Sequence, residues 1–168
     1  MGARGDAGYV EYVTARLPAL HRAAFLLCGG DAHRADDVVQ ETITRLYQRW
    51  RQARRAENLD AYVHRMLVHV FVDEKRRRWA KVKLLPWVGD GTAEASAGTP
   101  LEERSELMDA LRQLPARQRA AIVMRYLLDR SIDEVADALG CSAGTVKSQT
   151  SRGLTALRHL LPAVQDIR

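Results

Sequence analysis

The stretch that decides the fold is SIDEVADALGCSAGTVKSQTSRGLTALR, residues 131–158. Apolar residues recur at helical spacing through its first nine positions, and Gly140 follows them as a helix stop that can adopt positive φ. A second helix is expected to begin near Ser142. Two short helices joined by a tight glycine turn, the second rich in small polar and basic residues, predict an all-α helix-turn-helix unit.

The outward face of this second helix predicts contact with duplex DNA. Its polar side chains have the spacing of a single face, and they are of the kinds that form hydrogen bonds with base edges in a major groove. They are Thr145, Ser148, Gln149 and Arg152. Lys147 lies beside them, within reach of phosphates. The alternative is an ordinary solvated helix, but the turn and the polar face together favour DNA.

The composition of the 168 residues is that of a globular protein rich in helices. Hydrophobic residues make up 46% and charged residues 28%, with only 5 prolines, which excludes a disordered chain. The formal net charge of +5 favours a polyanionic partner. Cys28 and Cys141 match no metal-ligand spacing and indicate a reducing compartment. We see no signal peptide and no membrane-spanning apolar run, so we expect a cytoplasmic protein without membrane insertion.

Residues 84–100 divide the chain into two expected helical domains. Small residues and proline dominate this segment and the apolar periodicity is lost, which is typical of a linker. We therefore expect one helical domain at residues 1–83 and a second, containing the helix-turn-helix, at residues 101–168. A helix of the second domain is expected to turn four residues inward: Ile122, Val123, Tyr126 and Leu127.

A helix expected over residues 32–50, with Asp31 as its N-cap, has a buried and an acidic face. The buried face is expected to contain Val39, Ile43, Leu46, Tyr47 and Trp50. The other side contains Asp36, Asp37, Gln40, Glu41 and Thr44. Acids near a helix N-terminus complement the helix dipole, and a compact acidic face is also suited to docking a basic partner helix. Both interpretations of the acidic face stay open from the residues alone.

The outward stripe of the next helix, expected over residues 61–80, is suited to single-stranded nucleic acid. Its inner face is expected to contain Val63, Met66, Leu67 and Val70. The stripe contains Tyr62, Arg65, His69 and Arg76. Flat groups stack on bases and cations contact phosphates, although a solvated face explains the same stripe equally well. The basic run KRRRWAKVK, residues 75–83, extends the stripe through Arg77 and favours phosphate contact.

The residues predict neither an enzyme nor a metal site. His64 and His69 are five residues apart on one helix and point to different sides, so they do not chelate as an i, i+4 pair would. A glycine-rich phosphate loop and a nucleophile motif are both missing from the sequence. We therefore expect no catalytic residue, no cofactor, no metal and no small-molecule substrate.

Three motifs, in this order, resemble those of an extracytoplasmic-function sigma factor of bacterial RNA polymerase, in particular the actinobacterial SigE-type group. They are DDVVQETITRLYQRW at 36–50, AYVHRMLVHVFVDEKRRRW at 61–79, and LPARQRAAIVMRYLLDRSIDEVADALGCSAGTVKSQTSRGLTALR at 114–158. The resemblance covers nearly the whole chain. It implies two helical domains, sigma region 2 and sigma region 4, which together direct promoter-specific transcription initiation. It also implies that an anti-sigma factor binds the free protein.

The resemblance assigns a role to each surface. Docking on the β′ clamp helices of core polymerase falls to Asp37, Gln40 and Glu41. Opening the minus-ten element and holding its melted strand falls to the loop at 51–62 with Tyr62, Arg65, His69, Arg76 and Arg77. The linker would thread through polymerase channels, and apolar edges of the second domain would hold the β flap. Reading the minus-thirty-five element falls to Thr145, Lys147, Ser148, Gln149 and Arg152.

Two departures from the family pattern leave the promoter sequence open. Many members have Asn where this chain has His69, and many broader members have Arg-Leu where it has Gln149-Thr150, a pair common in the SigE-type group. Two rival functions are also open. A helix-turn-helix regulator acting alone would need a dimer interface, for which no heptad pattern is seen, and an enzyme acting on nucleic acid would need catalytic groups. The regulon, the inducing signal and any particular anti-sigma factor do not follow from the residues.

Overall fold

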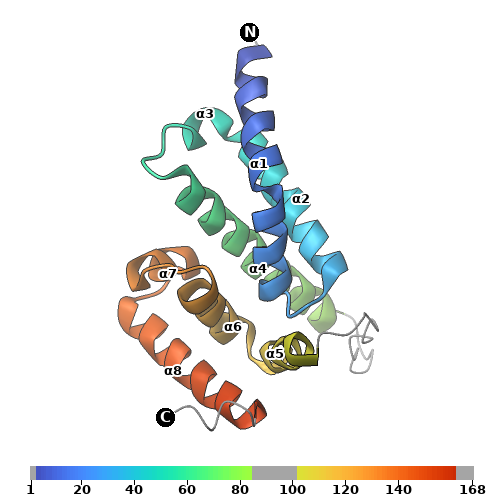
Figure 1. Cartoon of the computed structure of the whole chain (residues 1–168), viewed down its shortest axis with the longest axis vertical. Helices are drawn as coiled ribbons and strands as arrows, with labels where there is room; N and C mark the ends of the chain where they lie inside the picture. The colour runs from blue at the N-terminus through green and yellow to red at the C-terminus, as the bar shows by residue number, and fades with distance from the viewer. Residues whose placement is uncertain (1–2, 85–101, 162–168) are drawn as a thin grey trace.

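The computed structural model describes residues 3–84 and 102–161, and within these ranges every regular element is helical. The side chains of residues 3–6, 75–84 and 102–105 are outside the description. The expected linker at 84–100 therefore lies almost entirely outside the described residues. The all-α prediction is confirmed, and the helices form two modules, one before the linker and one after it (Figure 1).

The first module consists of α1 (Ala3–Leu27), α2 (Ala32–Gln48), α3 (Trp50–Ala53) and α4 (Leu59–Leu84). Two long helices, α1 and α2, pack as a hairpin, and α4 crosses behind them (Figure 1). The turn after α1 contains Gly29 and Gly30, whose φ angles are 65° and 85°. Residues with a side chain rarely adopt these positive values.

Two of these helices, α2 and α4, have a side-chain cap at the N-terminus, where a loop ends and the helical apolar pattern begins. Asp31 accepts a hydrogen bond from the backbone N–H of Arg34 over 3.1 Å, as expected for the N-cap of α2. Asn58 accepts from the N–H of Ala61 over 2.9 Å at the start of α4. Each cap satisfies a backbone donor that has no partner inside the helix.

The inner face of α4 is confirmed as predicted. Val63 and Leu67 are fully buried, and Met66 and Val70 are almost so. Phe71 is also fully buried, although the periodicity had not singled it out. Burying such side chains contributes about 1.5–3 kcal/mol each, so α4 supplies a large part of the apolar core of the first module.

The predicted inner face of α2 is wrong at Tyr47, which is 53% exposed. Val39 and Leu46 are buried, and Ile43 and Trp50 pack against the core, Trp50 from the separate short helix α3. The helix instead buries Val38 and Thr42, whose side-chain hydroxyl donates to the Val38 carbonyl over 2.7 Å. A threonine that satisfies its own hydroxyl in this way can lie in the core, which the apolar pattern alone does not indicate.

The second module consists of α5 (Glu102–Gln113), α6 (Ala116–Ile122), the π-helical η1 (Val123–Leu127), α7 (Ile132–Leu139) and α8 (Ala143–Leu160). The expected inward orientation is confirmed for Ile122 and Val123. It is wrong for Tyr126 and Leu127, which are 56% and 43% exposed. A π turn holds more residues than an α turn, so the side chains that follow are rotated out of the α-helical register.

The helix-turn-helix is α7 and α8. Ser131 and Glu134 form a capping box at the start of α7, and Ser142 accepts from the N–H of Thr145 at the start of α8. Gly140 ends α7 with φ 61° and ψ 44°, and a Cβ added there would meet nothing within 4 Å. The glycine is therefore needed for its backbone conformation rather than for space.

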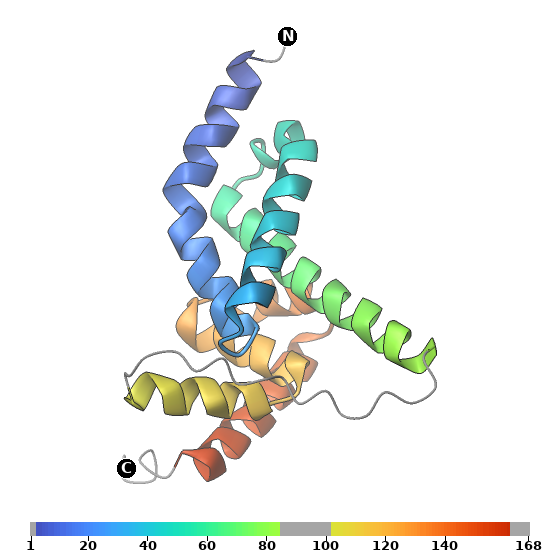
Figure 2. The same ribbon diagram turned by 90° about the vertical axis from the view of Figure 1, so that its right-hand side faces the viewer.

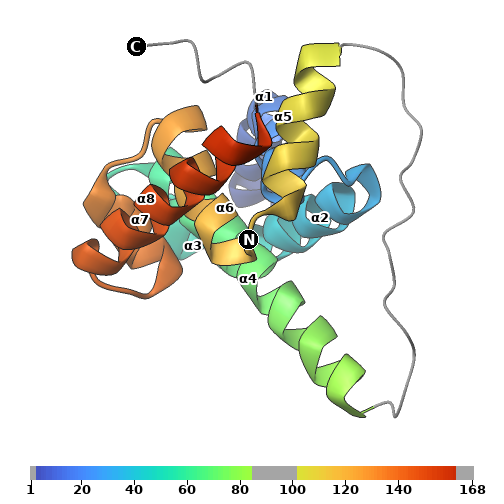
Figure 3. The same ribbon diagram turned by 90° about the horizontal axis from the view of Figure 1, so that it is seen from below.

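The two modules share one apolar core. Val63 and Leu67 of α4 belong to the same buried cluster as Val135, Leu139 and Val146 of the helix-turn-helix. The helices α4 and α7 pack side by side, and the second module lies against one end of the first (Figures 2 and 3). The division into domains at 1–83 and 101–168 stays a prediction about chain organisation. The structure adds that the two halves pack together.

Candidate nucleic-acid interface

The outward face of α8 presents the predicted duplex-reading residues to solvent. Lys147, Ser148 and Arg152 are exposed, while Thr145 and Gln149 are half-buried. Ser148 donates its hydroxyl to the Thr145 carbonyl over 3.0 Å. The structure therefore brings Thr145, Ser148, Gln149 and Arg152 together on one face, whereas Lys147 lies on the side of α8 that faces η1.

The opposite side of α8 fixes the helix against its neighbours. Thr150 is buried and donates its hydroxyl to the Val146 carbonyl over 2.7 Å. Gly153 is also buried, and a Cβ added to it would lie 2.5 Å from Cδ1 of Ile122 in α6. The close approach of α6 and α8 thus holds the reading face in one orientation, as a rigid recognition helix requires.

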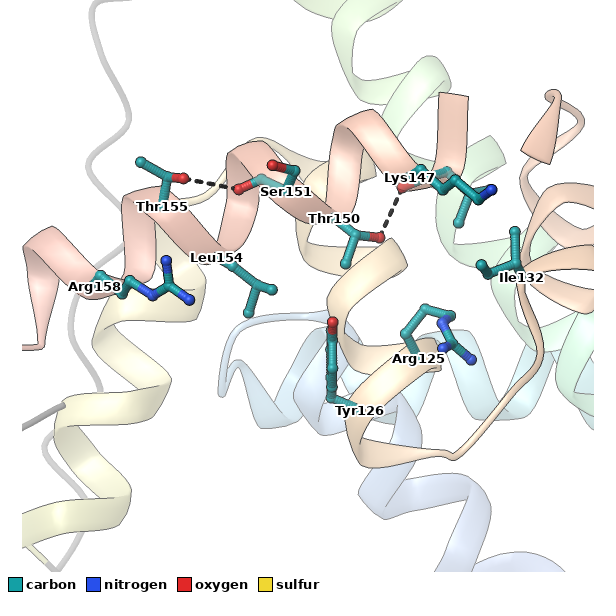
Figure 4. Close-up of a pocket in the computed structure, with 10 residues that line it drawn as sticks. Arg125, Tyr126, Ile132, Lys147, Thr150, Ser151, Leu154, Thr155 and Arg158 are labelled. Carbon is teal, nitrogen blue, oxygen red and sulfur yellow. Dashed lines mark hydrogen bonds between the residues drawn. The ribbon is translucent and has the colours of Figure 1, made fainter. Parts of the chain in front are cut away.

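A hollow of about 290 Å³ between η1 and α8 was not predicted from the sequence. Arg125 and Tyr126 of η1 face Lys147, Leu154 and Arg158 of α8 across it (Figure 4). Three cations beside an exposed tyrosine ring make a surface suited to an acidic partner with an apolar contact. The helical period of the sequence gives no signal for it, because Tyr126 lies in a π turn that the apolar pattern does not reveal.

The described part of the α4 stripe carries Tyr62, Arg65 and His69. Tyr62 and Arg65 are half-buried, and His69 is exposed. The guanidinium carbon of Arg65 lies 5.5 Å from the centre of the Tyr62 ring, which is a cation–π arrangement. Arg76 and Arg77 lie on the same helix, but their side chains are outside the described residues.

The second module covers the Tyr62–Arg65 end of this stripe. Nη1 of Arg65 lies 2.5 Å from Oδ2 of Asp137 in α7. A hollow of about 350 Å³ between α4 and α7 is lined by both of these residues together with Tyr62 and Arg130. Nε of Arg130 is buried there without a hydrogen-bond partner. Tyr62 and Arg65 thus lie at the junction of the two modules, which the sequence did not predict.

The acidic face of α2 is confirmed as an outward surface. Asp37 and Gln40 are exposed, and the Glu41 side chain is 46% exposed. A carboxylate oxygen of Glu41 accepts from Nε of Arg45 over 2.7 Å, and Asp73 lies 3.4 Å from the same guanidinium. These carboxylates hold the pKa of Arg45 above its usual value. Asp37 and Gln40 are therefore the most available groups on this face.

The dipole interpretation explains little of the α2 acids. The first turn of α2 contains no acidic residue, so both aspartates lie one turn further on. Asp36 pairs with His21 of α1 over 3.2 Å, whereas Asp37 points to solvent on the outer face. A structural role is thus visible for Asp36, and the outer face is left to Asp37, Gln40 and Glu41.

Two titratable side chains, His64 and Cys28, lie within the packing of the first module. Burial lowers the pKa of His64, whose Nδ1 lies 2.7 Å from the Asp60 carbonyl oxygen. Burial raises the pKa of the Cys28 thiol to about 11, which keeps it protonated. Within residues 3–84 and 102–161, three or more potential metal ligands do not gather at any one place. A helix long and apolar enough to cross a membrane is likewise not found in these ranges.

Comparison with protein families gives two matches, one for each module. Residues 12–81 match the family described as sigma-70 region 2, and residues 104–157 match the family described as sigma-70, region 4. The first match includes the α2 face and the described α4 stripe. The second includes α7 and α8 as far as Leu157, and with them the reading face.

Curated relatives match across both modules. The chain is 35% identical over 162 residues to the RNA polymerase sigma-E factor of Streptomyces coelicolor, covering 92% of this chain and 86% of that protein. It is 32% identical over 150 residues to the ECF RNA polymerase sigma factor EcfG of Rhodopseudomonas palustris, covering 89% and 82%. Both alignments extend through the segment that joins the modules.

Solved structures share the arrangement of helices. The sigma factor RpoE, solved in complex with the anti-sigma factor NepR from Bartonella quintana, matches with a TM-score of 0.73 and 26% identity. That match covers 96% of this chain and 99% of the other. CnrH, solved in complex with the cytosolic domain of CnrY, matches in fold with a TM-score of 0.64 and 22% identity, covering 96% and 91%.

Proposed function

Because the chain belongs to the sigma-70 family as an extracytoplasmic-function RNA polymerase sigma factor, which directs promoter-specific transcription initiation, we propose how its surfaces divide that work. The second module reads the minus-thirty-five element as duplex, and the first holds the minus-ten element as melted strand. Core polymerase supplies the catalytic centre. The observation that carries this proposal is the outward reading face of α8 and the outward acidic face of α2 on one chain.

Duplex reading is assigned to the N-terminal half of α8. Arg152 and Gln149 can form paired hydrogen bonds with base edges, Arg to guanine and Gln to adenine. Lys147 is placed to contact a phosphate and so positions the helix without reading sequence. The helix has the setting that a recognition helix needs, because its other side is packed against α6.

Strand binding is assigned to the outward stripe of α4. Tyr62 and His69 offer flat groups on which bases can stack, and Arg65 offers a cation for the backbone. Opening base pairs costs a few kcal/mol, which stacking and phosphate contacts must return. The sequence motif continues the stripe through Arg76 and Arg77, which lie about two turns beyond His69 on the same helix.

Core docking is assigned to Asp37, Gln40 and Glu41. Their face is acidic on a chain of net charge +5, so it is suited to a basic helical partner such as the β′ clamp helices. The β flap is assigned to exposed apolar residues of the second module, among them Tyr126 and Leu127. We place the protein in the cytoplasm with polymerase and infer an anti-sigma factor as a further partner, because the similar RpoE was solved with one.

The test is run-off transcription with purified core polymerase on a library of genomic fragments. We expect starts at a small set of fragments, each dependent on this protein. A catalogue of starts identical to that of core polymerase alone would refute the proposal. Binding of the isolated protein to one duplex site as a stable dimer, with no effect on polymerase, would favour the rival helix-turn-helix regulator.

A further inference from the structure

The contact between α4 and α7 places an acidic residue where a nucleic-acid phosphate is expected to bind. Asp137 is 64% exposed in its side chain and projects from the outer side of α7. Its carboxylate lies 2.5 Å from Arg65, a predicted phosphate-binding residue of the α4 stripe. A carboxylate and a phosphate make the same kind of charged hydrogen bond to a guanidinium, so the two compete for one position.

We propose that, in the free protein, α7 acts as an internal substitute for the melted strand, with Asp137 occupying the phosphate position of Arg65. The inference rests on the proposed function of the α4 stripe. We call this arrangement, with α7 packed on α4, the closed state. In it the second module covers Tyr62 and Arg65 of the first. Asp137 is the residue of α7 that makes this block, and removing its charge frees Arg65.

The geometry of Tyr62 supports the block. The Arg65 guanidinium lies over the Tyr62 ring, so the ion pair with Asp137 holds a cation where a base would stack. Tyr62 also lines the hollow between the modules, together with Glu134 and Asp137 of α7. An incoming strand therefore meets a covered ring, a paired guanidinium and two carboxylates that repel its phosphates.

The closed state is held at further points by second-module side chains. Nε of Arg119 donates to the Leu27 carbonyl over 2.7 Å, and Nε of Arg112 donates to the Gly29 carbonyl over 3.0 Å. Leu27 and Gly29 lie at or just after the end of α1, whereas the Arg65–Asp137 pair lies on α4, so the second module is bonded to two elements of the first.

The closed state cannot serve a promoter. The two promoter elements are roughly 25 base pairs apart, which is about 85 Å along duplex DNA. In the closed state, Arg65 of the α4 stripe contacts Asp137 of α7, and α7 is the helix directly before the reading helix α8. The modules must therefore separate before both elements are bound. The reading face of α8 stays exposed in the closed state, so duplex reading is not blocked in the same way.

The test measures strand binding by the full-length free protein, without polymerase. The probe is a fluorescein-labelled single strand of 12 nucleotides of mixed sequence, followed by anisotropy at low salt. We expect Asp137→Asn to bind it about two- to fivefold more tightly than the wild type, the fold-change that an exposed ion pair is worth. The matched control is Asp133→Asn on the same helix, which removes the same charge and is expected to bind as the wild type does.

A second comparison separates release of Arg65 from a general change of charge. In an Arg65→Ala background, adding Asp137→Asn is expected to give no gain, because there is no guanidinium to release. Equal binding by Asp137→Asn and Asp133→Asn would overturn the inference, as would a gain that persists without Arg65. If either result occurs while the protein still directs promoter-specific starts in run-off transcription, only this inference fails and the proposed function stands. If the protein adds no starts to those of core polymerase alone, the proposed function fails.

Discussion

Nε of Arg119, in the second module, donates a hydrogen bond of 2.7 Å to the backbone carbonyl of Leu27, at the end of α1 in the first. Arg119 is 2% exposed, and its Nη1 also donates to the carbonyls of Leu111 and Arg112, each over 3.2 Å. Its guanidinium carbon lies 5.8 Å from the centre of the Phe71 ring. One buried cation thus satisfies the ends of two helices, one in each module.

Replacing Arg119 by Met is therefore expected to destabilise the whole protein. The apolar part of the side chain is kept, but three backbone carbonyls each lose a hydrogen bond from the guanidinium, and only that of Leu111 keeps another, from the N–H of Leu114. We therefore expect a loss of about 2–4 kcal/mol in the free energy of unfolding. Urea denaturation followed by circular dichroism measures it. The control is Arg117→Met in the same helix, because Arg117 is exposed and makes a single bond to the Leu139 carbonyl. Equal losses for both variants would contradict the role given to Arg119.

Gly153 is expected to tolerate no side chain while Ile122 is present. A Cβ would lie 2.5 Å from Cδ1 of Ile122, which is 4% exposed and has little room to move. Gly153→Ala should gain about 1 kcal/mol of helix propensity but lose about 1–3 kcal/mol through overpacking, so we expect net destabilisation. Thermal unfolding of the single and double variants checks this.

Two variants make the Gly153 prediction specific. Ile122→Val removes Cδ1, so Gly153→Ala should cost less in that background than in the wild type. Gly144→Ala, on the same helix, places its Cβ no closer than 3.8 Å to its nearest neighbour, the Ser142 hydroxyl, and is expected to be neutral or stabilising. Identical costs for Gly153→Ala with Ile122 and with Val at position 122 would show that the close approach is not the cause.

His64 is expected to make the folded protein less stable as the pH falls below about 6.5. Burial lowers its pKa in the folded state, so the unfolded chain takes up a proton first. The stability contributed by neutral His64 is full above the unfolded pKa and is lost as the pH falls toward the folded pKa. Each unit between the two pKa values corresponds to about 1.4 kcal/mol.

The measurement is the free energy of unfolding in urea at about pH 7.5, 6.5 and 5.5, which are values above, at and below the ordinary pKa of histidine. His64→Gln should flatten this dependence, whereas His159→Gln, at an exposed histidine of α8, should leave it as in the wild type. The groups that act on His64 are Asp60, Arg130 and Arg16, and the two arginines oppose its protonation. A pH dependence unchanged in His64→Gln would assign the effect to other groups.

Local signals predicted the parts of the fold that depend on local chemistry. The Gly140 stop, the Asp31 cap and the inner face of α4 around Val63 and Leu67 follow from backbone conformation, side-chain oxygens and period, and the structure has all of them. The same signals placed Thr145, Ser148, Gln149 and Arg152 on one outward face of α8. Each of these features is decided within a few turns of chain.

The errors arise where contacts between distant elements decide the outcome. Tyr47 continues the helical period of α2, but its ring packs edge-on against Tyr9 of α1, 5.1 Å between centres, at an exposed position. Tyr126 is turned outward by a π turn, which the apolar pattern does not reveal. The pairing of Arg65 with Asp137 joins residues 72 positions apart, so no local pattern could predict it.

Asp37→Arg is expected to abolish binding to core polymerase while leaving the fold intact. Asp37 is exposed on the α2 face, so reversing its charge places a cation against a basic partner without disturbing the core. Binding of labelled protein to core polymerase, with circular dichroism as the check on folding, measures the effect. Glu11→Arg makes the same change of charge at an exposed position of α1 and should bind normally. Unchanged affinity of Asp37→Arg would remove the docking assignment.

Arg152→Ala is expected to reduce discrimination between the cognate minus-thirty-five element and random duplex by about 1–3 kcal/mol, because Arg152 is proposed to read a base edge. Lys147→Ala should instead weaken binding to all duplexes alike and lower the salt dependence by about one phosphate contact. Both side chains are exposed on α8, so neither change should alter stability. Competition binding with the polymerase complex on cognate and random duplexes measures both. If Arg152→Ala lost equal affinity on the two, Arg152 would be a phosphate contact, and sequence reading would fall to Gln149 and its neighbours on the same face.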